Sequence, residues 1–360
     1  MRIVVLPGDG IGPEITAATL EVLDTVDRRH GLGLAIEQHD IGLRSLATAG
    51  TTLPDPVVRR VAEADGTILG PVSHHDYPAG AVNPSAELRT RFALYANIRP
   101  CRSVAGLSVL REPMDLVIVR ENTEGFYADR NMHAGPGEFM PDPDSAFAIR
   151  KVTARSSRRV AQAAFDLART RRRVVTAVHK ANVLKLSDGL FLREVRAVAA
   201  DHPDVELREM IVDAAAARLI RDPAAFDVLV TTNMFGDILS DEASELAGSL
   251  GLGGAVNAGD FRCVAQAQHG SAPDIAGRGV ANPVSLIRSA AMLLDWHGTR
   301  SGRAELRAAA RSIQDAVDEV VARPETRTRD LGGHLSTAEA ARAVVDALGR
   351  RSPGHVEKVQ

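Results

Sequence analysis

The sequence predicts an α/β protein with a largely parallel sheet, because short apolar runs alternate with longer stretches of helical period. Runs typical of buried strands occupy residues 3–6, 66–69, 116–119, 174–178, 205–212 and 228–231. Stretches whose apolar residues recur with the helical period occupy residues 15–27, 157–170 and 188–200. The chain contains no internal repeat. The alternation therefore favours parallel strands joined by helices.

One segment breaks the alternation. Residues 131–148 are rich in Gly, Pro, Asp and Met, and neither helical nor strand periodicity runs through them. This segment is predicted to be a long loop.

Composition indicates an ordinary globular protein of 360 residues with 45 % hydrophobic content, enough for a large core in one unit or two domains. A formal net charge of −3 gives no support for nucleic acid or an anionic membrane as partner. No apolar run reaches the length of about 18 residues that spans a bilayer, and the sequence begins with a strand-like run, so no signal peptide is expected. Two cysteines, Cys101 and Cys263, form neither a disulfide framework nor a CxxC site, so a reducing cytoplasm is expected.

Two carboxylates stand four residues apart in the segment 233–241, NMFGDILSD, which follows the strand-like run 226–231. A helix that begins near Asp237 would place Asp237 and Asp241 on one face of its first turn. Like charges so close repel one another, and a divalent cation with oxygen ligands would relieve that repulsion. The alternative is a solvated acidic turn stabilised by the helix dipole. Asp213, after the run 205–212, is a third candidate ligand.

Seven segments in one order resemble the isocitrate/3-isopropylmalate dehydrogenase family, the metal-dependent β-decarboxylating dehydrogenases of 2-hydroxy acids. They are LPGDGIGPE (6–14), LYANIRP (94–100), VRENTEGFY (119–127), HKAN (179–182), NMFGDILSD (233–241), HGSAPDI (269–275) and DLGG (330–333). The glycines of the first segment superficially resemble a dinucleotide-binding fingerprint. Their continuation into Pro13 and Glu14 instead matches the N-terminal signature of this family, whose fold is not a Rossmann fold.

The resemblance implies an isopropylmalate dehydrogenase-like fold with two interleaved domains. Residues 1–100 and 248–360 would form a large cofactor-binding domain, and residues 101–247 a small dimerisation domain. A segment at about 128–150 would be an arm that clasps the partner in a homodimer. The two subunits would share their active sites.

The resemblance also implies the residues that bind substrate and metal. Substrate carboxylates would be bound by Arg89, Arg99 and Arg120, whose guanidinium groups pair bidentately with carboxylates, together with Asn182. Mg²⁺ or Mn²⁺ would be bound by Asp213, Asp237 and Asp241, with Asp213 supplied by the other subunit. Proton transfer would fall to Lys180, which reaches across the dimer interface, and Tyr127.

For the cofactor, the resemblance implies a site of His269, Gly270, Ser271, Ala272, Asp274, Ile275 and Asn282. A carboxylate at 274 can accept hydrogen bonds from both ribose hydroxyls of NAD and would repel the 2′-phosphate of NADP. NADP-using relatives carry lysine and tyrosine at the positions of Asp274 and Ile275, so NAD is expected. Gln266 departs from the family, because most relatives carry glutamate there.

Substrate choice depends on the residues before Arg89, among them Asn83, Ser85 and Ala86. Isopropylmalate enzymes tend to place leucines at the positions of Ser85 and Ala86, whereas isocitrate enzymes place serine and asparagine at those of Asn83 and Ser85. An alkyl substituent on C3 would leave an amide and a hydroxyl unpaired, at roughly 1–3 kcal/mol each. A malate with a polar or anionic C3 group, as in isocitrate, is therefore favoured.

Other functions stay open. They are a 3-isopropylmalate dehydrogenase, a tartrate or D-malate dehydrogenase, and a silent regulatory subunit of a hetero-oligomeric dehydrogenase. A regulatory subunit would be expected to lose the lysine, the tyrosine or the metal aspartates, and this chain keeps them.

Overall fold

A computed structural model describes residues 1–104, 107, 113–127, 132 and 135–350. The strands are β1 (Arg2–Leu6), β2 (Ala35–Gln38), β3 (Gly66–Leu69), β4 (Ala96–Arg102), β5 (Asp115–Glu121), β6 (Glu138–Asp142), β7 (Ser145–Ala148), β8 (Val174–His179), β9 (Glu206–Ile211), β10 (Val228–Thr231), β11 (Gly254–Ala258) and β12 (Cys263–Ala267). The longer helices are α1 (Gly12–His30), α2 (Gly42–Ala49), α3 (Asp55–Glu63), α4 (Pro84–Arg91), α5 (Ala154–Arg169), α6 (Ser187–Ala200), α7 (Val212–Arg221), α8 (Asn233–Ala247), α9 (Val284–Ser301), α10 (Ala304–Ala322) and α11 (Thr337–Arg350).

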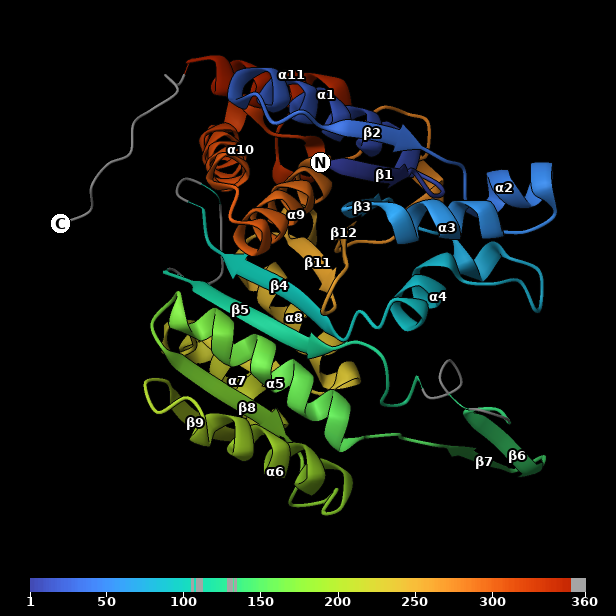
Figure 1. Cartoon of the computed structure of the whole chain (residues 1–360), viewed down its shortest axis with the longest axis vertical. Coiled ribbons are helices and arrows are strands. Elements are labelled where there is room, and N and C mark those ends of the chain that lie inside the picture. The colour runs from blue at the N-terminus through green and yellow to red at the C-terminus, as the bar shows by residue number, and fades with distance from the viewer. Residues whose placement is uncertain (105–106, 108–112, 128–131, 133–134, 351–360) are drawn as a thin grey trace.

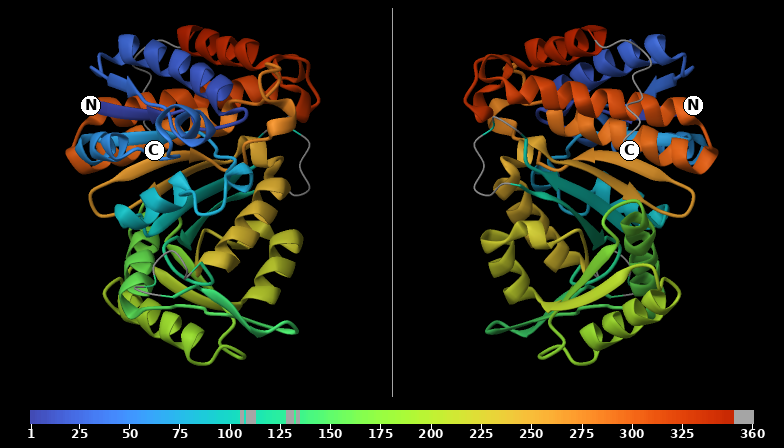
Figure 2. Two further views of the ribbon diagram at one scale, coloured as in Figure 1. Left: turned by 90° about the vertical axis from the view of Figure 1, so that its right-hand side faces the viewer. Right: turned by 90° about the vertical axis from the view of Figure 1, so that its left-hand side faces the viewer.

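One ten-stranded sheet runs through the molecule in the order β2-β1-β3-β12-β11-β4-β5-β10-β8-β9, with helices along both faces (Figures 1 and 2). Strand pairs toward both edges are parallel. At the centre β4 pairs antiparallel with both β5 and β11, and β11 pairs antiparallel with β12. The predicted α/β class is confirmed, and the antiparallel centre is a feature that strand periodicity does not reveal.

The two ends of the chain contribute to one core, since α1 packs against α11 beside α9 and α10 (Figure 1). Buried side chains such as Ile15, Leu293 and Ile313 fill that core. A second core lies between β5, β8 and β10 and the helices α5 and α6, with Phe165 and Phe191 buried in it. The domain boundaries at residues 100 and 248 stay a prediction, because the sheet is continuous and β4 itself runs through residue 100.

Two local predictions are wrong. Helix α8 begins at Asn233 rather than near Asp237, because Thr232 is still extended and the helix forms directly after it. Asp237 and Asp241 nevertheless share one face, since their spacing of four residues is close to one helical turn. Part of the predicted loop 131–148 is a ribbon of β6 and β7 (Figure 1). The rings of Phe139 and Phe147 stack across this ribbon, with their centres 5.3 Å apart.

The other parts of the predicted clasp arm at 128–131, 133 and 134 lie outside the described residues. Among the described helices, none combines the length and apolar character that crossing a bilayer requires.

Candidate active site

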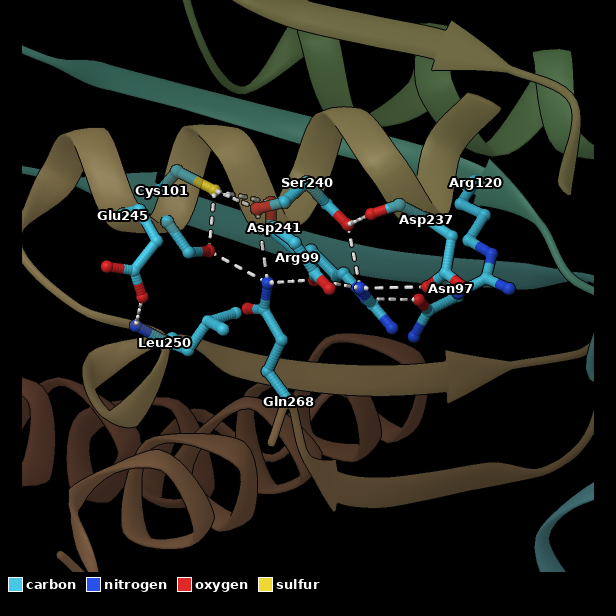
Figure 3. A network of polar contacts seen from close by, with 12 residues as sticks. Asn97, Arg99, Cys101, Arg120, Asp237, Ser240, Asp241, Glu245, Leu250 and Gln268 are labelled. Atoms are coloured by element: carbon cyan, nitrogen blue, oxygen red, sulfur yellow. Dashed lines mark hydrogen bonds and ion pairs between the residues drawn. The ribbon is translucent and has the colours of Figure 1, made fainter. Parts of the chain in front are cut away.

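Two of the predicted metal ligands, Asp237 and Asp241, meet two of the predicted substrate arginines, Arg99 and Arg120, where α8 packs against β4 and β5 (Figure 3). Arg99 extends from β4, Arg120 from β5, and both carboxylates from α8. Gly236 allows this approach, because a Cβ atom there would lie 2.6 Å from Cγ of Arg120. Three elements distant in sequence therefore supply one cluster of charges.

Each guanidinium group is neutralised by these carboxylates. Nη1 of Arg99 lies 3.1 Å from Oδ1 of Asp241 and 3.4 Å from Oδ1 of Asp237, and it donates to the hydroxyl of Ser240 at 2.7 Å. Nη1 of Arg120 donates to Oδ1 of Asp237. The arginine side chains are 8 % and 4 % exposed, whereas those of Asp237 and Asp241 are 34 % and 49 % exposed. The carboxylates thus pair with buried cations on one side and face an accessible space on the other.

Burial and charge shift the pKa values of this cluster. Burial raises the pKa of Asp241, and the nearby charge of Arg99 opposes that shift. Burial lowers the pKa of Arg120 to about 10, and repulsion from Arg99 adds to the effect. Two like-charged guanidinium groups are tolerated here because Asp237 lies between them.

Tyr127 joins the same cluster from the segment after β5. Its hydroxyl donates to Oδ2 of Asp237 at 3.3 Å, and the guanidinium carbon of Arg120 lies 5.9 Å from the centre of its ring. A phenol that donates to a carboxylate beside a cation can exchange a proton with a substrate bound there.

Lys180, Asn182 and Asp213 lie elsewhere on the chain. Lys180 follows β8, and its ammonium donates to the carboxylate of Asp213 in the first turn of α7. That hydrogen bond holds the pKa of Asp213 below its usual range. Asn182 is exposed in the loop after Lys180.

The backbone of Lys180 is held firmly. Its amide donates to the buried carboxylate of Asp188, which also pairs with Arg150.

The chain by itself supplies two of the three predicted metal ligands at one place. Within the described part of the chain, no three His, Cys, Asp or Glu side chains gather as a metal site. The oxygens of Asp237 and Asp241 suit a hard divalent cation.

The predicted specificity residues lie on α4. Ser85 Oγ and Arg89 Nη2 both donate to Oε1 of Gln266, at 3.1 and 3.2 Å. Asn83 instead caps α4, its side-chain oxygen accepting a hydrogen bond from the amide of Ala86 at 3.2 Å. Two of these three predicted substrate residues therefore meet at Gln266, while the oxygen of Asn83 is committed to the helix.

The predicted cofactor residues 269–275 form the loop after β12, with Asp274 exposed on the short 3-10 helix Pro273–Ile275. The glycine turn before α1 supports this loop. The amide of Ile11 donates to the carbonyl of Ser271 at 2.8 Å, and a Cβ atom on Gly10 would lie 2.0 Å from that carbonyl oxygen. Ser271 also bonds the hydroxyl of Ser73 at 2.8 Å.

His269 offers a place for a cofactor group. Nδ1 lies 2.9 Å from the carbonyl of Gly270, which can only accept, so Nδ1 carries the proton. Burial lowers the pKa of His269, which keeps the ring neutral and leaves Nε2 as an acceptor. Nε2 is buried and has no hydrogen-bond partner among the described residues. An incoming donor, such as a ribose hydroxyl or a carboxamide, would satisfy it.

Asn282 is held beside this loop. Its amide donates to Asp330 at 2.9 Å and its carbonyl accepts from the amide of Val284 at 3.0 Å.

Comparison with known proteins shows the family of the chain. The model of the isocitrate/isopropylmalate dehydrogenase family matches residues 2–346. The chain belongs to this family. It is 40 % identical to the 3-isopropylmalate dehydrogenase of Methanothermobacter thermautotrophicus, over 97 % of this chain and 98 % of that protein. It is 41 % identical to an isocitrate/homoisocitrate dehydrogenase of Thermus thermophilus, over 96 % and 98 %.

A solved structure supports the same assignment. The crystal structure of isocitrate dehydrogenase from Methylococcus capsulatus aligns with a TM-score of 0.85 at 38 % identity, over 96 % of this chain and 99 % of that chain. The predicted family is confirmed. The chain is therefore a decarboxylating dehydrogenase of the isocitrate/isopropylmalate dehydrogenase family, in which dependence on a nicotinamide dinucleotide and a divalent metal is general.

Sequence motifs did not single out several residues that build the site. Asn233 accepts from Arg120 and donates to the carbonyl of Glu124, and Ser240 accepts from Arg99. Asn233 and Ser240 lie in the segment 233–241, four residues before Asp237 and three after it. In a helix, this spacing would have predicted that both side chains lie on the same face as Asp237. Asp330, which holds Asn282, stands inside DLGG.

Proposed function

We propose that this protein oxidises and decarboxylates a 3-substituted malate with NAD, and that the C3 substituent is polar or anionic, as in isocitrate. The observation that carries the proposal is the cluster of Arg99, Arg120, Tyr127, Asp237 and Asp241. It places two guanidinium groups, a phenol and two carboxylates at one accessible place.

Each group has a role in this reaction. Arg99 and Arg120 would bind substrate carboxylates, because guanidinium groups keep their charge and pair bidentately. Tyr127 would deliver a proton to the substrate carbon after loss of CO2. A bound Mg²⁺ or Mn²⁺, held by Asp237 and Asp241, would polarise the C2 oxygen of the substrate.

A homodimer would complete each site with Lys180 and Asp213 of the partner subunit. Two features favour this. Lys180 and Asp213 form an ion pair with each other rather than with Asp237 or Asp241. Large apolar side chains are exposed on α7, on α8 and on the β6–β7 ribbon, namely Ile220, Ile238, Phe139 and Phe147 at 54 %, 59 %, 48 % and 53 %. The helices α7 and α8 pack against each other, and exposed apolar side chains on neighbouring elements are typical of a surface that another chain covers.

NAD is favoured over NADP by Asp274. Its carboxylate is exposed on a short helix of the loop that also contains Nε2 of His269, an atom without a hydrogen-bond partner in the described part of the chain. A ribose 2′-phosphate beside a carboxylate would be repelled, whereas ribose hydroxyls can donate to it.

A polar C3 group is favoured by Ser85, a residue that is only 7 % exposed and whose hydroxyl is held by Gln266. The hydroxyl oxygen of Ser85 can still accept a hydrogen bond, which a polar C3 group can donate and an isopropyl group cannot. A second candidate, 3-isopropylmalate, is favoured by the capping role of Asn83, which leaves fewer polar groups on α4 for the substrate. Similar relatives carry the names of both substrates.

Steady-state kinetics with Mn²⁺ would test the proposal. The panel contains isocitrate, homoisocitrate, 3-isopropylmalate, D-malate and tartrate, each with NAD and with NADP. The Asp237→Asn variant is the control for activity from contaminants. We expect the highest kcat/KM with isocitrate or another anionic substrate and NAD. A kcat/KM for 3-isopropylmalate about tenfold or more above that for the anionic substrates would refute the polar pocket.

A further inference from the structure

A chain of amide side chains connects Arg89 to Arg99. Oε1 of Gln266 accepts hydrogen bonds from Nη2 of Arg89 and Nδ2 of Asn257, both at 3.2 Å. Oδ1 of Asn257 accepts from Nδ2 of Asn97 at 3.1 Å. Oδ1 of Asn97 accepts from Nε of Arg99 at 2.6 Å. The two predicted substrate arginines are thus connected through three amides.

The donor properties of arginine set the direction of this chain. A guanidinium group can only donate, so Asn97 must present its oxygen to Arg99. Its NH2 group is then left to donate to Asn257, and the NH2 group of Asn257 to Gln266. At the other end Gln266 must again present oxygen, because Arg89 also donates. Turning any one amide around would place two donors or two acceptors face to face.

The amides stand on the rigid centre of the sheet. Asn257 in β11 lies directly opposite Asn97 in the antiparallel pair of β11 and β4, and Gln266 lies on the adjacent strand β12. Asn257 is 1 % exposed and Asn97 is 2 % exposed. Buried amides without partners are costly, so this arrangement resists rearrangement.

We propose that Asn257 is a positioning residue that sets the relative placement of the Arg89 and Arg99 guanidinium groups, and thereby the affinity for substrates with two or more carboxylates. The inference rests on the proposed function, which assigns those arginines to the substrate. Asn257 itself does not contact the substrate. Its influence passes through Gln266 on one side and Asn97 on the other.

The test compares Asn257→Leu with Asn122→Leu. Asn122 is a matched control, since it is a buried amide, 4 % exposed, whose Nδ2 donates to Oδ1 of Asn257 at 2.9 Å. It lies on a side branch and not between the two arginines. Each variant removes a buried amide of the same size and replaces it with an apolar side chain of similar volume, so their thermal stabilities serve as the measure of purely structural damage.

Two quantities are measured for each variant. The first is KM and kcat with the substrate of the panel that the wild type uses best. The second is the Kd of isocitrate by calorimetry without NAD. We expect Asn257→Leu to raise KM and Kd by about tenfold to a hundredfold, the loss typical of one hydrogen bond to a charged group. We expect kcat to stay within about threefold, because groups that touch the reacting atoms are unchanged.

A conservative variant adds a second reading. Asn257→Asp keeps the acceptor for Asn97 and, when its carboxyl group is ionised, has no proton to donate to Gln266. It should raise KM and Kd as Asn257→Leu does, although its shape is that of the native residue.

The outcomes separate the two proposals. Equal effects of Asn257→Leu and Asn122→Leu on KM and Kd, at equal loss of thermal stability, would overturn the positioning role. If the wild type binds isocitrate but oxidises no substrate of the panel, the proposed function fails, and the calorimetric Kd values still decide the positioning role. If the wild type neither binds isocitrate nor oxidises any substrate of the panel, both proposals are overturned.

Discussion

At the scale of residues, the site is governed by the fact that a guanidinium group cannot give up its charge. Arg99 and Arg120 are buried only because carboxylates, amide oxygens and a hydroxyl accept from them. The carboxylate of Asp237 pairs with Arg99 and accepts hydrogen bonds from Arg120 and Tyr127. Substitution of Asp237 should therefore affect more of the site than substitution of any one of these partners.

Asp237→Asn should reduce kcat by about a hundredfold or more and raise the Mn²⁺ concentration for half-maximal activity, because a charged oxygen ligand is lost. It should also lower the free energy of unfolding by about 1–3 kcal/mol, because the buried guanidinium groups of Arg99 and Arg120 lose a charged partner. Metal titration of the initial rate and urea unfolding measure these effects.

Glu245→Gln is the control for Asp237→Asn. It removes a carboxylate from the same helix, one that accepts a hydrogen bond from the amide of Leu250 at 2.9 Å (Figure 3). An unchanged metal requirement in Asp237→Asn would contradict the assignment of the Asp237 carboxylate.

Asp274→Lys should raise kcat/KM with NADP and lower it with NAD, shifting the ratio about tenfold or more, because a repulsive charge becomes an attractive one. Thermal stability should hardly change, since Asp274 is exposed. Asp274→Asn removes the negative charge without adding a positive one, so it measures how much of the shift comes from lost repulsion of the 2′-phosphate alone. Equal use of NAD and NADP by the wild type would show that Asp274 does not discriminate.

At the scale of elements, α5 begins at a buried carboxyl group. Glu124 accepts hydrogen bonds from the amide and the hydroxyl of Thr153, at 2.7 and 2.9 Å, and Thr153 in turn caps α5 by accepting from the amide of Ser156. Burial, with repulsion from Glu121, raises the pKa of Glu124 to about 7. The start of this helix is therefore coupled to pH.

The sign of that coupling follows from the proton balance. Between the ordinary pKa of a glutamate, about 4.5, and about 7, the folded state retains a proton that the unfolded chain has released. The contribution of Glu124 to the free energy of unfolding should thus fall as pH rises through this window, by at most about 1.4 kcal/mol per pH unit. Urea unfolding of the wild type and Glu124→Gln across this range should show a steeper decline in the wild type.

Glu138→Gln, on the exposed strand β6, is the control for this slope. Burial lowers the pKa of some histidines, such as His179 and His297. Their contribution to the free energy of unfolding rises with pH in part of the same range. The comparison between variants cancels their effect, since both proteins contain them. Identical slopes in the wild type and Glu124→Gln would refute the role of Glu124.

At the scale of the whole molecule, the separation of the site residues is the deciding feature. Asp237 and Asp241 gather with the substrate arginines, while Lys180 and Asp213 pair with each other. If the second pair serves the active site of a partner subunit, mixing two inactive proteins, Lys180→Ala and Asp237→Asn, should restore activity. Some mixed dimers would contain one site with both native residues, so recovery to about a quarter of wild-type activity at most is expected.

Subunit exchange is checked separately, with fluorescent labels on the two variants. Each variant mixed with itself is the control for slow reactivation. Exchange without any recovery of activity would argue that each site lies within one chain.

Local sequence patterns determined much of the fold. The α/β class could be predicted because the spacing of apolar residues reports which faces of an element are buried, whatever they pack against. The strands at 66–69, 174–178 and 228–231 agree with β3, β8 and β10 to within one residue at each end. The start of α8 and the β6–β7 ribbon were missed, because capping and short strand pairing leave little periodicity.

The charge types of the site were visible in the sequence, but their pairing was decided by the tertiary structure. Nothing local to Asp237 indicates that Arg99 and Arg120 will neutralise it, since they come from strands more than a hundred residues earlier. Asn83 is bound to its own helix, and Asn257 lies between two arginines only because β11 pairs antiparallel with β4. Periodicity reports the burial of one element, whereas contacts between elements depend on which strands become neighbours, and that is a property of the whole sheet.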